Sequence, residues 1–195
     1  LELGKVLVMG EYKETTVYQV NLSAQDLTKR MVRNERDIFR NDVGIGVTES
    51  GRAGSNGFAI RGVDKDRVAV IVDGLPQAET FMPSIYKGYG YFNGSINNTE
   101  YENISEVQVN KGANSVNDGS GAIGGSVYFK TKNIDDFVKP NQNLGLYWKT
   151  AYASKNREWR QVIGAGFKTN GLFGFAQVTK RRGHETMNNG KGEDI

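Results

Sequence analysis

Three consecutive segments near the C-terminal end of the sequence alternate between apolar and other side chains, and this alternation constrains the fold more than any other feature. Successive side chains of an extended strand point to opposite faces. Residues 144–153 have a broad apolar face made of Leu144, Leu146, Trp148 and Tyr152. Residues 158–168 have a second one made of Trp159, Ile163, Ala165 and Phe167. Residues 172–179 continue as a third strand.

Tight turns join these segments, since Asn170 and Gly171 form a dipeptide that two-residue hairpins favour. Strands of about ten residues joined by tight turns are what a tilted strand needs to cross a membrane. A soluble meander with one face on a core, as in a surface adhesion module, fits the same pattern. The alternation does not decide which face of the third strand is the apolar one, because Phe173 and Phe175 alternate with Leu172, Ala176 and Val178.

Before about residue 140 the sequence mixes short helical and strand signals with glycine-rich connections. Ser23 with Asp26, and Asn34 with Asp37, are helix-start signals. We expect strands at residues 5–9, 58–61, 68–72, 104–109 and 126–132. Residues 68–72 are apolar at every position, which predicts a strand in the centre of a sheet. The predicted fold is a small α+β domain, a mixed sheet with short helices, over residues 1–140, followed by antiparallel strands over residues 141–195.

The amino-acid composition excludes most kinds of catalytic site and metal-binding site. The 195 residues include no cysteine and a single histidine, His184, which excludes disulfides, thiolate zinc sites and histidine clusters. No nucleophile, base and orienting group can be assembled, so we predict no catalytic residue and no enzyme activity. Asp64, Asp66 and Asp73 lack the full oxygen cage of a calcium site, and no metal is predicted. The longest apolar run, Val68–Val72, is too short for a membrane-spanning helix.

Two short motifs suggest other functions. Residues 119–124 match the dinucleotide fingerprint G-x-G-x-x-G, which must open a helix. A strand-like run at residues 126–131 follows instead, so we favour close packing of the glycines and keep a soluble nucleotide-binding enzyme as a distant alternative. The basic triplet Lys180, Arg181 and Arg182 has no aromatic residues interleaved, and we predict no nucleic-acid partner.

Residues 81–92 combine large aromatic side chains with glycines and show little periodicity. Tyrosine offers a wide contact area at low rotamer cost, which suits a recognition loop. Packing of the loop against its own domain is the alternative. The candidate ligand-binding residues are Phe81, Tyr86, Tyr89, Tyr91 and Phe92.

Several stretches follow one another in a distinctive order, at residues 57–62, 67–74, 106–112 and 119–131. Over nearly the whole chain this order resembles the plug domain of TonB-dependent outer-membrane receptors. Residues 100–103, 111–115 and 181–185 are similar to the branch of these receptors that takes iron or haem from host haemoglobin, transferrin or lactoferrin. Residues 88–93 favour the haemoglobin members.

The resemblance implies a protein of the bacterial outer membrane, in which a barrel of about 22 strands is filled by the plug. Residues 141–195 have room for about three such strands. We therefore expect the chain to be the N-terminal piece of a longer receptor. Haem or ferric iron would be the transported substrate rather than a permanent cofactor, and host haemoglobin is favoured over transferrin or lactoferrin as its carrier. Further implied partners are TonB, through an N-terminal segment not evident here, outer-membrane lipids and a lipoprotein co-receptor.

The resemblance also implies how the plug is held. Arg61, Glu106 and Lys111 would lock the plug to the barrel through ionic and water-mediated contacts. Such contacts separate more readily than dry apolar packing. A plug that must move during transport is therefore expected to have a polar outer surface.

A second set of residues resembles a family loop associated with the passage of iron, namely Glu100, Tyr101 and Glu102. Carboxylate and phenolate oxygens suit ferric ion. Asn98 and Thr99 depart from the transferrin-type pattern at the two preceding positions, which favours haem. With no histidine in the plug, an axial haem ligand there would be Tyr86, Tyr89 or Tyr91.

Overall fold

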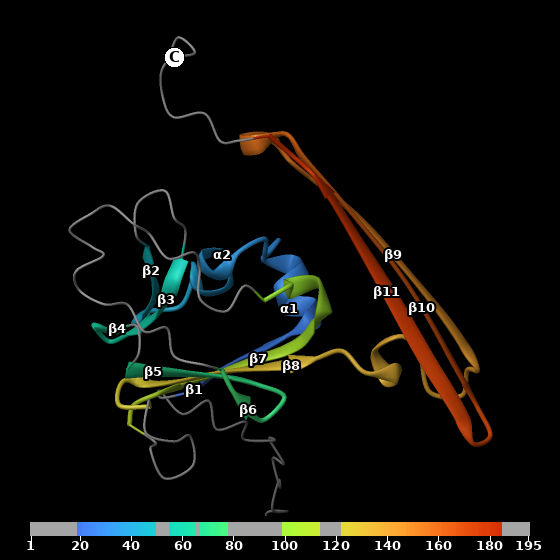
Figure 1. The fold of residues 1–195 in the computed structure, drawn as a ribbon, viewed down its shortest axis with the longest axis horizontal. Helices are drawn as coiled ribbons and strands as arrows, with labels where there is room; N and C mark the ends of the chain where they lie inside the picture. The colour runs from blue at the N-terminus through green and yellow to red at the C-terminus, as the bar shows by residue number, and fades with distance from the viewer. Residues whose placement is uncertain (1–18, 50–54, 65–66, 78–98, 114–121, 185–195) are drawn as a thin grey trace, which may run out of the picture.

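The computed structural model describes residues 19–49, 55–64, 67–77, 99–113 and 122–184. A mixed α/β unit comes first, and three long antiparallel strands run beside it (Figure 1). This arrangement confirms the predicted α+β fold followed by antiparallel strands. The predicted strand at residues 5–9 and the aromatic segment 81–92 lie outside the described residues. None of the described helices has the length and apolar composition needed to cross a lipid bilayer.

The elements of the first unit, in chain order, are β1 (Gln19–Ser23), α1 (Ala24–Lys29), α2 (Glu35–Phe39), β2 (Ile45–Glu49), β3 (Ser55–Ile60), β4 (Val63–Asp64), β5 (Val68–Val72), β6 (Leu75–Pro76), β7 (Ile104–Lys111) and β8 (Gly125–Thr131). Short 3-10 helices flank the last two strands, with η3 (Tyr101–Asn103) before β7 and η4 (Ile134–Asp136) after β8. The second unit consists of β9 (Leu144–Ala153), η5 (Ser154–Asn156), β10 (Glu158–Thr169) and β11 (Leu172–Arg182).

Both short helices begin where the sequence predicts them. The Ser23 hydroxyl accepts from the Asp26 N–H at 3.3 Å, and the Asp26 carboxylate accepts in return from the Ser23 N–H at 3.0 Å. Asn34 caps α2 by accepting from the Asp37 N–H at 3.1 Å. These caps satisfy backbone donors that a helix start leaves unpaired. The first helix ends at Lys29, and the chain turns at Met31 with a positive φ of 51°.

A five-stranded mixed sheet in the order β1-β7-β8-β5-β6 forms the base of the first unit. Its pairs are antiparallel except for β5 with β8, which run parallel. The strand β5 lies in the interior of this sheet as its apolar sequence predicts, but the central strand is β8. Among the described strands, the two-residue β6 lies beyond β5 at the edge of the sheet, a pairing that the sequence analysis did not include. A smaller sheet, β2-β3-β4, adjoins it.

The core of the first unit lies between the five-stranded sheet, the small sheet and the two helices. Aromatic rings cross from one layer to the next, with Phe39 of α2 edge-on to Phe58 of β3 at 5.6 Å between centroids. Phe58 in turn lies 6.0 Å from Phe129 of β8, and Tyr101 of η3 lies 6.2 Å from Phe129 on another side. The loop that carries Tyr101 is thereby packed onto the core, which fixes the residues beside it.

The strands β9, β10 and β11 form a separate antiparallel sheet with alternating faces. Apolar side chains of all three strands meet on its outer face, where Trp148 pairs with Ile163 and Ile163 with Val178. These outer side chains are exposed in the chain, Trp148 by 75% and Val178 by 70%. The pairing also settles the facing of the third strand, because Phe175 pairs with Gly166 on the inner face.

The glycines of the G-x-G-x-x-G motif are described only at its end. Strand β8 begins at Gly125, directly after the motif, so the helix that a dinucleotide fingerprint needs is not formed there. A Cβ on Gly124 would come within 2.6 Å of Val63, and Gly125 has a φ of 137°. Close packing explains Gly124, as predicted, while Gly119 and Gly121 lie outside the described residues.

Candidate functional site

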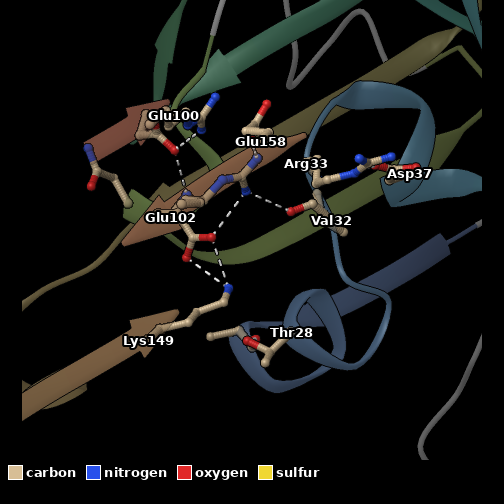
Figure 2. A network of polar contacts seen from close by, with 12 residues as sticks. Thr28, Val32, Arg33, Asp37, Glu100, Glu102, Lys149 and Glu158 are labelled. Atoms are coloured by element: carbon tan, nitrogen blue, oxygen red, sulfur yellow. Dashed lines mark hydrogen bonds and ion pairs between the residues drawn. The ribbon is translucent and has the colours of Figure 1, made fainter. Parts of the chain in front are cut away.

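The two units meet at the η3 loop, and Glu102 is the centre of that contact. Its side chain is only 5% exposed. The Nζ atom of Lys149 on β9 lies 2.9 Å from both carboxylate oxygens, and Nη1 of Arg160 on β10 lies 3.2 Å from Oε1. Figure 2 shows Glu102 facing Lys149, with the dashed lines converging on the one carboxylate. A buried negative charge of the first unit is thus held by two positive charges of the three-stranded sheet.

Arg160 connects three parts of the molecule although its side chain is only 4% exposed. Besides Glu102, its Nη1 atom donates to the Val32 carbonyl at 3.2 Å, and Nη2 donates to Glu158 at 3.1 Å. Val32 lies between α1 and α2, and Glu158 lies on the same strand as Arg160 (Figure 2). A buried guanidinium is stable only when such partners replace its lost hydration.

Further polar contacts extend the site along β11. Gln177 donates through Nε2 to the Glu102 carbonyl at 3.0 Å and to Oδ1 of Asn103 at 2.7 Å. The Nζ atom of Lys132 donates to Oε1 of Gln177 at 3.3 Å. Arg181, nearer the end of β11, forms an ion pair with Glu100.

Burial changes the acid–base properties of two groups beside Glu102. Loss of hydration lowers the pKa of the Lys132 ammonium, and the positive charge of Lys149 adds to that effect while Glu102 opposes it. Burial also raises the pKa of the Tyr101 phenol well above its ordinary value. At neutral pH Tyr101 is therefore a neutral phenol. A cavity of about 420 Å³ lies beside this cluster, lined in part by Leu27, Tyr101, Lys132 and Tyr147.

A second, apolar contact joins the units on the same face of the sheet. Phe137, next to η4, stacks on Phe175 of β11 with 5.1 Å between ring centroids. Glycines on β9 and β10 make room for it. A Cβ on Gly164 would come within 2.5 Å of the Phe137 ring, one on Gly166 within 2.8 Å of Phe137 Cβ, and one on Gly145 would overlap the Phe137 carbonyl oxygen. We call the pocket formed by Gly145, Gly164 and Gly166 the glycine slot.

The comparison with protein families identifies this architecture. The sequence model described as TonB-dependent Receptor Plug Domain matches residues 12–126. The chain belongs to this family. Its members are receptors of the bacterial outer membrane, and this is where the chain is located. We therefore call the first unit the plug and the sheet β9–β11 the wall.

Curated relatives include proteins with two kinds of named ligand. Lactoferrin-binding protein A of Neisseria meningitidis is 46% identical over 171 residues, covering 86% of this chain and 18% of that protein. Hemoglobin-haptoglobin utilization protein B of the same species is 42% identical over 197 residues, covering 99% of this chain and 24% of that protein. The chain thus spans about a quarter or less of the length of these relatives.

Solved structures share the fold at lower identity. The FrpB iron transporter from Neisseria meningitidis superposes with a TM-score of 0.70 at 20% identity, covering 92% of this chain and 26% of that one. The Serratia marcescens hemophore receptor HasR, solved with its hemophore HasA and heme, gives a TM-score of 0.68 at 23% identity, covering 83% and 24%. These likenesses concern the fold of plug and wall alone.

The three residues of the predicted iron-passage loop lie together but in different surroundings. Glu102 is enclosed by Lys149 and Arg160, Tyr101 is packed on the plug core, and Glu100 is half-buried beside Arg181. Among the described residues, no group of three histidine or carboxylate side chains is placed to hold a metal ion. In this arrangement the loop joins plug to wall.

The predicted locking residues lie elsewhere on the plug. The Arg61 N–H donates to the Gly44 carbonyl at 2.8 Å, and Nζ of Lys111 donates to the Val43 carbonyl at 2.9 Å, so both flank one loop. Glu106 is half-buried on β7. Figure 1 shows β3 and β4, next to Arg61, on the side of the plug away from β9–β11. The candidate ligand-binding residues of segment 81–92 lie outside the described part of the chain.

Sequence reasoning missed the wall side of the contact. Lys149, Arg160 and Gln177 were not selected as candidate site residues, and Arg181 was considered only within a basic triplet. The signal was present in the alternation, because Lys149 and Arg160 occupy inward positions of strands whose other inward positions include glycines. A charge on the same face as small, close-packing residues indicates a partner on the opposite surface.

Proposed function

We propose that the chain is the N-terminal part of a longer TonB-dependent receptor that binds a host haem or iron carrier protein and imports haem, with haemoglobin favoured as the carrier. The family consists of receptors and not of enzymes. The main support for the proposed ligand is the match to a haemoglobin-haptoglobin utilization protein over 99% of this chain. A second relative, from Haemophilus influenzae and named for binding hemoglobin and hemoglobin-haptoglobin, covers 90% of it.

The wall is proposed to be the first three strands of the receptor barrel, with membrane lipids as the partner of its outer face. That face has large exposed apolar side chains on each strand, including Leu146, Trp148, Ile163 and Val178. Exposed apolar surface of this extent needs a covering. Strands of 10, 12 and 11 residues have the length that a tilted membrane strand requires.

The second candidate is a receptor for lactoferrin or transferrin iron. It is favoured by the 46% identity to lactoferrin-binding protein A. The residues Glu100, Tyr101 and Glu102 remain candidates for passing iron or haem once the plug has moved, because the two carboxylates would then be released from Arg181, Lys149 and Arg160. The buried state described above does not offer these oxygens to a metal.

Three further roles belong to the same proposal. Arg61, Glu106 and Lys111 would contact strands of the barrel that follow residue 195 in the longer receptor. Phe81, Tyr86, Tyr89, Tyr91 and Phe92 would contact the carrier protein or haem. TonB would supply the force that moves the plug, and a lipoprotein co-receptor would help to capture the carrier.

The test uses the full-length receptor in isolated outer membranes. Immobilised haemoglobin, lactoferrin and transferrin are each incubated with these membranes, and soluble carrier is added as competitor. We expect the membranes to be retained on immobilised haemoglobin, and soluble haemoglobin to abolish this retention. Retention on lactoferrin or transferrin alone would replace the first candidate by the second, and retention on none would contradict both.

A variant with Tyr86, Tyr89 and Tyr91 changed to phenylalanine separates carrier binding from haem handling. It keeps the rings and removes the phenol oxygens that could ligate haem iron. We expect the variant to bind haemoglobin and to lose growth on haemoglobin as the iron source. Unchanged growth would exclude these phenols as haem ligands.

A further inference from the structure

The plug touches the wall in two zones of opposite chemistry. The ionic zone joins residues 100–103 of the plug to Lys149, Arg160, Gln177 and Arg181. The other zone is the glycine slot, which receives residues 134–138. The Phe137 and Val138 side chains are almost fully buried there, at 8% and 2% exposed.

These zones respond differently to separation in water. When the ionic zone opens, each charge and amide regains hydration that largely replaces its lost partner, so an ion pair gives little net resistance. When the slot opens, Phe137 and Val138 expose apolar surface for which water offers no compensation. Separation of the glycine slot therefore costs more free energy than separation of the ionic zone.

Residues 133–138 can also stay behind as an independent piece, because their polar groups are satisfied locally. Asn133 and Asp136 form a reciprocal cap, in which the Asn133 N–H donates to Asp136 at 2.8 Å. The Phe137 and Val138 N–H groups both donate to the Ile134 carbonyl. None of these hydrogen bonds depends on β7 or β8.

We propose that plug movement divides at residues 132–133, so that the ionic zone opens while residues 134–138 remain seated in the glycine slot. The inference rests on the proposed receptor function. The β8 strand ends at Thr131, and the Lys132 N–H donates to the Asn103 carbonyl at 2.8 Å, so Lys132 belongs to the part that leaves. Residues 134–138 then act as the hinge-side anchor of the plug.

Two engineered cysteine pairs in the full-length receptor test this division. The first pair, Asn103→Cys with Gln177→Cys, bridges the ionic zone, where these side chains are 2.7 Å apart. The second, Asp135→Cys with Lys168→Cys, bridges the anchor to the wall, where these side chains are 3.0 Å apart. A short bifunctional methanethiosulfonate reagent links each pair reversibly. The chain itself has no cysteine, so each pair is the reaction site within it.

Haem uptake from haemoglobin should be lost when the first pair is linked and restored by reducing agent. Linking the second pair should leave uptake at the level of the same variant before linking. Equal loss with both pairs would overturn the proposal, because the anchor would then have to move as well. Unchanged uptake with the first pair linked would overturn it too.

A measurement without transport separates this inference from the proposed function. Val162 is fully buried on the inward face of β10, opposite Lys149 in the strand register, so a Val162→Cys residue reacts with a thiol reagent only after the ionic zone opens. A bismaleimide links each pair first, and mild urea is then added before the thiol reagent. Linking the first pair should protect this cysteine, and linking the second should not. If unmodified receptor takes up no haem, the proposed function fails while the labelling result still decides the division of the plug.

Discussion

Replacing Glu102 by glutamine removes the one negative charge that Lys149 and Arg160 share, while the side chain keeps its size. Breaking a buried ion pair by removing one partner costs about 3–5 kcal/mol. Two features of the structure place the expected free-energy cost at the lower end of this range. Glu158 still neutralises Arg160 at 3.1 Å, and the Lys149 side chain is 22% exposed. A loss of about 3 kcal/mol raises the population of the opened plug by roughly a hundredfold.

Labelling of Val162→Cys in the full-length receptor measures that population, because the labelling rate follows the fraction of opened plug when reclosing is fast. The matched control is Asp135→Asn, which breaks another ion pair between plug side and wall. That pair, with Lys168 at 3.0 Å, is 69% and 53% exposed and should be worth no more than about 1 kcal/mol. Equal labelling rates in Glu102→Gln and the unsubstituted background would refute the reasoning that Lys149 and Arg160 destabilise the closed contact once their shared carboxylate is removed.

Three further outcomes follow from single contacts in the plug and wall. Ser23→Ala removes the cap of α1 and should lower plug stability by about 1 kcal/mol, measured by calorimetry. Hydrogen bonds from Thr131 lower the pKa of Asp73 below its ordinary value. Its stabilising contribution is therefore present above the unfolded pKa of about 3.9 and is lost as the pH falls through the lower folded value. The calorimetric midpoint should fall less steeply below pH 4 in Asp73→Asn. Gly145→Ala places a methyl group against the backbone of the neighbouring segment and should reduce the amount of assembled receptor in outer membranes. Gly46→Ala, with no atom within 4 Å of the new Cβ, should not.

Local signals predicted the plug elements well where one residue type has one structural role. The Ser23 and Asn34 caps begin the two helices, and the apolar run at 68–72 is an interior strand. The dipeptide at Asp73 and Gly74 was not recognised as a turn, since Asp73 was considered in a carboxylate cluster and residues 67–74 in the family resemblance. It is a hairpin turn between β5 and β6 with positive φ at both residues, a standard signal for such turns.

Turn geometry was less predictable than turn position. The β10–β11 hairpin forms at Asn170 and Gly171, but only Gly171 has a positive φ, at 86°. Strands that depend on pairing with distant segments, such as β1 and β2, had no local signal strong enough to predict them. The pairing of β1 with β7 joins Gln19 to Asn110, a separation that periodicity cannot detect.

The sequence analysis selected the plug residues of the candidate site but not the wall residues that contact them, because those contacts join segments far apart in the sequence. Glu102 was selected as a functional carboxylate, yet its surroundings depend on a wall strand some fifty residues away in sequence, at Lys149. Residue chemistry alone gives no indication of its pairing with Lys149 and Arg160. That pairing depends on the strand register, which turns both side chains inward.

The inward face of the wall separates the two contact zones along its strands. Gly145 of β9 pairs with Gly166 of β10 on this face, and Gly164 is the next inward residue of β10. Lys149 and Arg160 lie on the same face, farther from the β10–β11 hairpin. The glycine end admits residues 134–138, while Lys149 and Arg160 face Glu102. The dry contact is therefore at the end where the plug chain enters the wall, and the ionic contact is farther along the same strands. This separation is what the proposed division of the plug requires, because one contact can open while the other stays closed.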